Sequence, residues 1–135
     1  MSESLSAKQL KQAQTAINSD PTFKQLGSID LNLAIRVMNT CFQVVFDGFS
    51  CKEINKLKVS ELRDEDCVLK FTRDQWTRFI EGCRTGTGPS LIDLDTIEGL
   101  TEASSPIKQL LIPRYHLSLQ TFFEAYANLD KAQAA

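Results

Sequence analysis

The sequence has few of the residues that build metal centres or strongly charged surfaces. It contains one histidine and four cysteines, no two of which form a CxxC pair: Cys41, Cys51, Cys67 and Cys83. One histidine and such wide spacings do not complete a common zinc site, so we expect no metal and four free thiols. A net charge of −2 offers no basic surface for nucleic acid or for an anionic membrane. We therefore predict that the protein does not bind nucleic acid.

Long apolar runs and targeting sequences are missing as well. No apolar run is long enough to cross a bilayer, and the polar N-terminal segment MSESLSAKQLKQ lacks the apolar centre of a signal peptide. The C-terminal KAQAA is not a peroxisomal Ser-Lys-Leu sequence. We predict a single domain over residues 1–135, without a membrane span and located in the cytoplasm.

Helix signals are present in the N-terminal region, residues 1–27. Ser6 and Gln9 have the spacing of a capping box, which predicts a helix from there to about Asn18. Pro21 suits the first position of a second, short helix, and Gly27 suits its end. We expect two helices in this region.

Strand signals follow in residues 28–72. Apolar residues occupy alternate positions, as in a strand with one buried face: Ile29, Leu31, Leu33, Ile35 and Val37. The segment CFQVVFDGFSCKEI predicts a hairpin with Asp47-Gly48 as its loop, so that Phe46 would pair with Phe49. A further strand is predicted over residues 66–72, and the RDED segment at 63–66 is expected to be a solvated turn. The region predicts three or four antiparallel strands.

An amphipathic helix is predicted over residues 73–83. Thr72 and Gln75 form a second capping box, and Gly82 is expected to end the helix. Its apolar face is formed by Trp76, Phe79, Ile80 and Cys83.

Residues 84–112 carry weaker signals. RTGTGPS is expected to be a loop, LIDLDTIEGL fits either a short helix or a last strand, and PIKQLLIP fits a helix. Pro113 opens a final helix predicted over residues 113–131. One face of that helix is rich in aromatic residues: Tyr115, Leu119, Phe122, Phe123, Tyr126 and Leu129.

Residues that support catalysis are scarce. No nucleophile elbow such as GxSxG accompanies His116, and a surface or half-buried position is the favoured interpretation of this histidine. The run from Gly82 to Gly88 lacks the Lys-Ser/Thr of a phosphate-binding loop, and Asp93 and Asp95 lack the rest of a calcium-binding loop. We predict no cofactor and no catalytic residue, with His116 as the acid–base candidate if the protein is an enzyme.

The aromatic stripes on the two longer helices have two interpretations. A core that covers a sheet and the wall of an apolar cavity require the same residues, so periodicity cannot separate them. The core is the simpler interpretation. The adjacent Phe122 and Phe123, however, widen the apolar arc of the final helix beyond what one contact with a sheet requires, which favours a pocket.

The order of elements resembles the sterol carrier protein family. The matching parts are the strand LNLAIRVMN, the hairpin FQVVFDGFSCKEI, the strand DCVLKFT and a following helix that contains Trp76, within residues 29–83. Downstream, IEGLTEASSPIKQLLIP stands where the family has a glycine-flanked strand. The resemblance implies an α+β fold with a mostly antiparallel sheet of about five strands, covered on one face by helices, and a hydrophobic tunnel between sheet and helices.

By position, the resemblance places nine residues in the lining of that tunnel: Val44, Phe46, Phe71, Trp76, Phe79, Ile80, Phe122, Phe123 and Tyr126. It implies an apolar ligand, which we predict to be a lipid, sterol, polyketide or terpenoid. Tyr115 and His116, together with Arg114 and Tyr126, are our candidates for orienting the polar end of that ligand.

Two alternatives stay open. A small lyase, isomerase or cyclase would use the same pocket and would need His116 or one of Asp93, Asp95 and Glu98 facing it. An accessory protein-interaction module would present an exposed apolar patch to a partner protein or to a second copy of the chain. We expect a binding protein rather than an enzyme.

Overall fold

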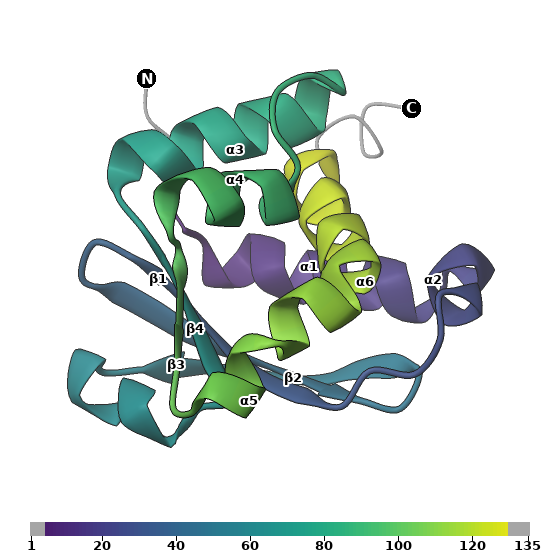
Figure 1. Ribbon diagram of the computed structural model, residues 1–135. Helices are drawn as coiled ribbons and strands as arrows, with labels where there is room; N and C mark the ends of the chain where they lie inside the picture. The colour runs from purple at the N-terminus through teal and green to yellow at the C-terminus, as the bar shows by residue number, and fades with distance from the viewer. Residues whose placement is uncertain (1–4, 130–135) are drawn as a thin grey trace.

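Helices cover one face of a five-stranded sheet (Figure 1). The computed structural model describes residues 5–129. Its helices are α1 (Ala7–Asn18), α2 (Pro21–Gln25), α3 (Arg73–Thr85), α4 (Leu91–Glu98), α5 (Pro106–Gln109) and α6 (Leu111–Ala127). Its strands are β1 (Leu31–Val37), β2 (Thr40–Asp47), β3 (Ser50–Leu57), β4 (Cys67–Phe71) and β5 (Thr101–Ala103). A 3-10 helix, η1 (Val59–Asp64), joins β3 to β4.

The sheet has the strand order β3-β2-β1-β4-β5. Neighbouring strands are antiparallel except β1 and β4, which run parallel with Leu33 beside Cys67. This arrangement confirms the predicted α+β class with a mostly antiparallel sheet of five strands. We call the face covered by α1, α3 and α6 the inner face, and the face that carries η1 the outer face.

Alternation along β1 places its larger apolar side chains on the inner face. Four of them are at most 5% exposed and belong to the main core: Leu31, Leu33, Ile35 and Val37. Ala34, between them, is buried on the outer face in a cluster with Leu62 of η1. The strand predicted from this alternation is therefore confirmed, and Ile29 lies buried just before it.

The β2–β3 hairpin turns one residue later than the sequence predicts. Phe46 pairs with Cys51 and not with Phe49, which leaves Gly48 and Phe49 as the two loop residues in place of Asp47 and Gly48. Of these two loop residues, only Gly48 has a positive φ, 66°. A two-residue loop that needs positive φ only at its first residue favours glycine at that residue. The predicted pairing of Phe46 with Phe49 is therefore wrong.

Helix α3 passes the glycine that was expected to end it. The helix begins after Thr72, which exchanges the two hydrogen bonds of the predicted capping box with Gln75. It ends at Gly86, whose φ of 75° is left-handed. Gly82 lies inside the helix because the returning loop packs against it: a Cβ at this position would lie 2.5 Å from the carbonyl oxygen of Thr87. Gly82 permits this close approach and does not terminate the helix.

Residues 91–112 contain helices α4 and α5, strand β5 and the first residues of α6, so the helix predicted at PIKQLLIP is present as α5 and the start of α6. Ser90 caps α4, and the short β5 that follows pairs antiparallel with β4. Helix α6 begins at Leu111, two residues before Pro113, and bends at Tyr115, whose φ of −106° and ψ of 15° are not helical. The parts of the predicted N-terminal and final helical regions at residues 1–4 and 130–131 lie outside the described residues. The assignment of residues 1–135 to a single domain stays a prediction.

Candidate functional site

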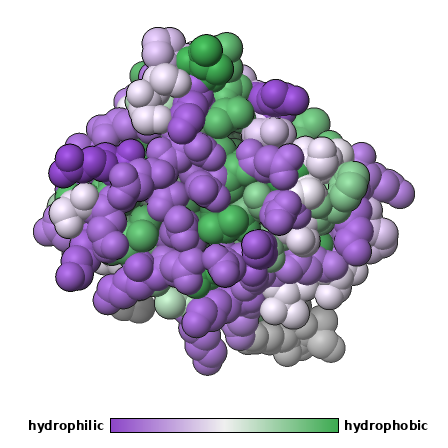
Figure 2. Space-filling model, turned by 90° about the horizontal axis from the view of Figure 1, so that it is seen from below, coloured by the Kyte–Doolittle hydropathy of each residue, from purple (hydrophilic) through white to green (hydrophobic). Residues whose placement is uncertain are grey.

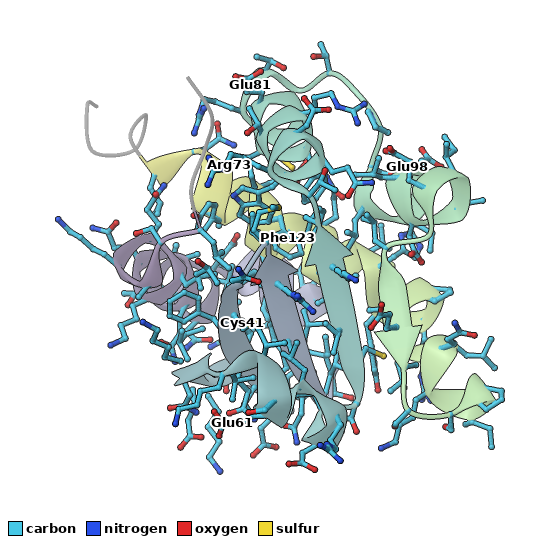
Figure 3. All side chains as sticks on the ribbon, turned by 90° about the vertical axis from the view of Figure 1, so that its left-hand side faces the viewer. Cys41, Glu61, Arg73, Glu81, Glu98 and Phe123 are labelled. Carbon is cyan, nitrogen blue, oxygen red and sulfur yellow. The ribbon has the colours of Figure 1, made fainter. Side chains whose placement is uncertain are left out.

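An aromatic layer fills the space between the inner face and helices α3 and α6. Its six side chains are at most 2% exposed: Phe71, Trp76, Phe79, Phe122, Phe123 and Tyr126. The rings contact one another, with centroids 5.1 Å apart for Phe71 and Trp76, 5.5 Å for Trp76 and Tyr126, and 5.3 Å for Phe79 and Phe123. Phe123 is labelled in Figure 3, on the inner side of the strands. The helices are thus held to the sheet by direct ring-to-ring packing.

The remaining predicted lining residues lie beside this layer. Val44 and Phe46 of β2 and Ile80 of α3 are buried in the same core cluster. Phe46 meets Phe122 edge-on, with centroids 5.6 Å apart. The fold therefore gathers all the predicted lining residues from four separate elements, and their role in binding a ligand stays a prediction.

The aromatic layer contains one hydrogen-bond donor without an acceptor. Trp76 is 0% exposed, and its indole Nε1 has no hydrogen-bond partner. The hydroxyl of the neighbouring Tyr126 accepts a hydrogen bond from the Ser6 N–H at 3.1 Å. A buried indole N–H usually has a partner, and leaving such a group unpaired costs about 1–3 kcal/mol. An oxygen atom delivered to this point would remove that cost.

An opening at the ends of β1 and β4 reaches the aromatic layer. It has a volume of about 340 Å³ and lies between the β1–β2 turn, the start of α3 and the end of α4. We call it the mouth. Its lining includes Arg36, Met38, Lys70, Phe71, Gln75 and Glu98. Phe71 belongs both to the lining of the mouth and to the aromatic layer, where its ring contacts that of Trp76.

Hydrogen bonds fix the polar rim of the mouth. The Gln75 side chain accepts from the Thr72 N–H at 2.8 Å and donates to Glu98 Oε1 at 3.3 Å. Arg78 donates to the same Glu98 oxygen at 3.4 Å. Glu98 is therefore tied to α3 from two residues and serves to join α4 to α3.

The β1–β2 turn forms the other side of the mouth. Met38 has a φ of 56°, the only positive value of a non-glycine residue among those described. Its carbonyl oxygen accepts a hydrogen bond from Arg36 Nε at 2.7 Å, and its side chain is half exposed. This left-handed conformation is uncommon for an unbranched apolar residue, and it places the Met38 side chain at the opening.

The polar residues predicted at the start of the final helix do not line the mouth. Arg114 is exposed, and its guanidinium lies over the Tyr115 ring at 5.4 Å. Tyr115 and His116 are each of intermediate exposure. A role of these three side chains in orienting a ligand stays a prediction.

Of the acidic candidates for catalysis, Glu98 alone lines the mouth. Asp95 accepts a hydrogen bond from the Thr101 N–H at 2.8 Å and so joins α4 to β5. Asp93 is exposed on α4. The three acids lie on α4, whereas His116 lies on α6.

All four cysteines are buried and free. Burial raises the pKa of the Cys51 and Cys83 thiols to about 12 and that of Cys67 to about 11. The thiolate is the reactive form of cysteine, so these thiols behave as apolar side chains. Within residues 5–129, no group of three His, Cys, Asp or Glu side chains could hold a metal ion.

The outer face carries a smaller apolar cluster and a buried acid. Seen from below the sheet, the surface is largely hydrophilic, with hydrophobic residues showing in limited areas (Figure 2). The cluster consists of Ala34, Cys41, Leu62 and Val68, and Figure 3 shows Cys41 on the strands between Glu61 of η1 and Phe123.

A buried acid, Glu65, also lies on the outer face. It is 5% exposed and is the only buried charged residue in the described part of the chain. The expectation of a solvated turn at residues 63–66 is therefore wrong for Glu65, although Arg63 and Asp64 are exposed.

A chain of hydrogen bonds holds one oxygen of Glu65. Asn55 Nδ2 donates to Gln43 Oε1 at 2.9 Å, and Gln43 Nε2 donates to Glu65 Oε1 at 2.7 Å. Glu65 Oε2 is buried without a partner. Burial raises the pKa of the Glu65 carboxyl, the Gln43 hydrogen bond lowers it, and the charges of Asp66 and Asp64 raise it further. The net result is a carboxyl whose pKa lies above its ordinary value.

Neither the mouth nor Glu65 follows from the sequence. The mouth combines residues of β1, β4, α3 and α4, which share no local motif. The sequence around Glu65 is a run of charged residues, and such runs are usually solvated. No local signal distinguishes the one member of the run that turns inward.

Comparison with known proteins identifies the fold. No family model and no curated protein sequence matches the chain. The crystal structure of sterol carrier protein 2 matches with a TM-score of 0.70 and 12% sequence identity, over 93% of this chain and 98% of that chain. The solution structure of a conserved hypothetical protein from Thermus thermophilus, described as possibly a sterol carrier protein, matches with a TM-score of 0.67 and 14% identity, over 93% and 90% of the two chains. No helix in residues 5–129 is long and apolar enough to cross a membrane. The chain has the fold of sterol carrier protein 2, and the resemblance predicted from the sequence is confirmed at the level of the fold.

Proposed function

We propose that this protein binds an apolar small molecule, such as a lipid, sterol, polyketide or terpenoid, between the inner face and helices α3 and α6. The fold is shared with sterol carrier protein 2, a protein named as a carrier of sterols, and this likeness supports the proposal. The predicted lining residues support it further, since they lie together in one apolar layer.

The observation that carries the proposal is the unpaired indole N–H of Trp76. Four aromatic rings contact Trp76, and no acceptor from the described residues 5–129 reaches Nε1. A ligand with a mostly hydrocarbon body and one hydroxyl or carbonyl oxygen would place hydrocarbon among the rings and an acceptor at Nε1. Burial of the hydrocarbon would contribute about 25 cal/mol per Å² of apolar area removed from water.

The mouth provides the route by which the ligand enters. Phe71 lines the mouth, and its ring centroid lies 5.1 Å from that of Trp76. Rotation of the Phe71 ring would connect the mouth to the centre of the aromatic layer. Met38 and Leu100 at the mouth offer apolar contacts to the part of the ligand that enters last.

The first experiment determines whether the purified protein holds an apolar molecule. Native mass spectrometry, followed by solvent extraction, would reveal a co-purified mass and its chemical class. A clean apo mass, combined with no uptake of a fluorescent sterol or fatty acid, would overturn the proposal and assign the aromatic layer to the core alone.

The second experiment tests the role of Trp76. It compares the affinity for a long-chain alcohol with that for the alkane of the same length, in the wild-type protein and in Trp76→Phe and Phe123→Leu. Trp76→Phe should lower the preference for the alcohol by about fivefold to tenfold, since one neutral hydrogen bond contributes roughly 1 kcal/mol. Phe123→Leu, which removes a ring but no N–H, should retain the preference. An unchanged preference in Trp76→Phe would show that Nε1 does not contact the ligand oxygen.

A further inference from the structure

A second pocket lies on the outer face, between η1 and strands β4 and β5. It has a volume of about 370 Å³, which falls in the range of small-molecule sites. We call it the outer pocket. Val59, Leu62 and Val68 contribute apolar side chains to its lining, and Glu65 lines it together with Arg36 and Arg63. It shares only Arg36 with the mouth, so it is a separate site.

Glu65, one of the residues that line this pocket, has an unused acceptor. The residue is 5% exposed, and Oε2 has no hydrogen-bond partner, whereas Oε1 accepts from Gln43 at 2.7 Å. Buried charges in proteins are paired, and the large majority of buried polar side-chain atoms have at least one hydrogen-bond partner. Oε2 therefore marks the position at which a donor is missing.

The two arginines that line the outer pocket, Arg36 and Arg63, form no ion pair with Glu65. Lys108 pairs with Asp66, the next residue in the sequence, at 3.1 Å. Arg36 donates through Nε to a backbone carbonyl of the β1–β2 turn, and Arg63 is exposed at the surface. Within residues 5–129, no cation lies within ion-pair distance of Glu65, and its sequence neighbours on both sides are acidic. A donor that carries positive charge would form a stronger hydrogen bond to this carboxylate than a neutral donor.

We propose that the outer pocket binds a small organic ammonium ion, whose cationic group donates to Glu65 Oε2 and whose hydrocarbon body packs against Leu62 and Val68. The ammonium supplies the hydrogen bond and the charge that the fold leaves out. The apolar wall formed by η1 selects an amine with a hydrocarbon chain over a fully hydrated cation. This site does not depend on the proposed binding of an apolar ligand at the inner face.

The test compares three probes of equal chain length on the full-length protein: n-hexylammonium, 1-hexanol and hexanoate. Binding is followed by NMR, with the methyl groups of Leu62 and Val68 as reporters. We expect n-hexylammonium to bind at least about tenfold more tightly than 1-hexanol, since a hydrogen bond to a charged group contributes more than a neutral one. Hexanoate should bind most weakly of the three. These comparisons use the wild-type protein and do not depend on the folding of any variant.

Two variants test whether the preference for n-hexylammonium over 1-hexanol depends on Glu65. Glu65→Gln keeps the shape and an acceptor for the Gln43 hydrogen bond but removes the charge, and it should bind n-hexylammonium and 1-hexanol with equal affinity. The matched control Glu102→Gln removes a negative charge from an exposed residue in the lining of the same pocket and should retain the preference. Uptake of an apolar ligand at the inner face should be the same in all three proteins.

Three results would overturn the proposal. They are equal affinity of the wild-type protein for n-hexylammonium and 1-hexanol, an ammonium preference that survives in Glu65→Gln, and no shift of the Leu62 and Val68 methyl signals with any probe. The last result would mean that only solvent occupies the outer pocket. None of the three bears on the ligand of the inner face, so the two proposals fail independently.

Discussion

The inner and outer faces of the same sheet are filled in different ways. On the inner face, rings from β4, α3 and α6 pack directly against one another, and no charged side chain of residues 5–129 is buried among them. On the outer face, a short 3-10 helix covers a small apolar cluster, and a hydrogen-bonded chain from Asn55 through Gln43 to Glu65 runs beside it. The first face derives its stability from apolar area, and the second contains a polar network that the fold leaves incomplete.

Each face nevertheless contains a buried polar atom without a partner. On the inner face the atom is a donor, Trp76 Nε1, and on the outer face it is an acceptor, Glu65 Oε2. A molecule that binds the inner face therefore has to offer an oxygen, whereas one that binds the outer face has to offer a proton donor. The two faces therefore differ in the polar group that a bound molecule must offer, as well as in how tightly their side chains are packed.

The largest loss of stability should follow the removal of an aromatic ring from the inner face. Phe123 is fully buried, and Phe123→Ala should lower the free energy of unfolding by about 3–5 kcal/mol, measured by urea denaturation. Phe49→Ala is the control, because Phe49 is 54% exposed in the β2–β3 loop, and it should change stability by less than about 0.5 kcal/mol. If Phe123→Ala costs less than about 1 kcal/mol, the rings do not pack as tightly as their contacts indicate.

A matched pair of leucines compares the packing of the two faces directly. Leu69 is 0% exposed on the inner face, and Leu62 is 8% exposed on the outer face. Leu69→Ala should cost about 3–5 kcal/mol and Leu62→Ala about 2 kcal/mol, because the outer pocket already adjoins Leu62 and less contact is lost there. Thermal and urea denaturation of both variants would give the order, and equal losses would contradict the difference between the faces.

The pH dependence of stability should isolate Glu65. Folding raises the pKa of this carboxyl, so its contribution to stability is present below the ordinary value of 4.5 and is lost as the pH rises through the raised value of the folded state. Glu65→Gln does not titrate and should therefore exceed the wild type in stability at neutral pH, by on the order of 1 kcal/mol. The gap between the two proteins should close below pH 4.5. Denaturation across this pH range gives the comparison, and a gap that widens toward acid pH would show that Glu65 is stabilised as the carboxylate.

The smallest effect should come from an exposed ion pair at the outer edge of the sheet. Lys70 Nζ lies 3.8 Å from Glu102, and both side chains are more than half exposed. Lys70→Ala should change the free energy of unfolding by no more than about 0.5 kcal/mol, because water and salt screen such pairs. Urea denaturation at low and high salt provides the measurement. A larger or salt-independent loss would assign Lys70 a structural role at the mouth.

The predictions that held depend on interactions between residues close in the sequence. The alternation from Leu31 to Val37 requires only that one face of a strand be buried. Ser6 caps α1 by accepting a hydrogen bond from the Gln9 N–H, and Thr72 forms the full capping box with Gln75, so both residues mark the starts of their helices correctly. The reciprocal bond predicted at Ser6 is absent, because the Ser6 N–H donates to the Tyr126 hydroxyl. These signals locate elements without reference to the rest of the chain.

The predictions that failed depend on segments far apart in the sequence or on a choice between two local solutions. Gly82 is a glycine because Thr87 returns to it, and Glu65 is buried because Gln43 of β2 lies beside it. The two-residue loop of the β2–β3 hairpin can consist of Asp47-Gly48 or of Gly48-Phe49, and the structure uses the second. Prediction of the candidate site from the sequence was limited as well, because a filled core and the lining of a cavity require the same aromatic residues.

The parallel pairing of β1 with β4 has a consequence for the order of folding. Two-residue turns join β1 to β2 and β2 to β3, so these three strands can pair by closing short loops. Strand β4 can dock only after η1 has carried the chain to the other side of β1, and such non-local contacts form slowly because the loop must be ordered first. We expect the three-stranded unit to form early and β4 to join late, together with α3. Docking of β4 on β1 and formation of the contact between Phe71 and Trp76 would then be the same kinetic event.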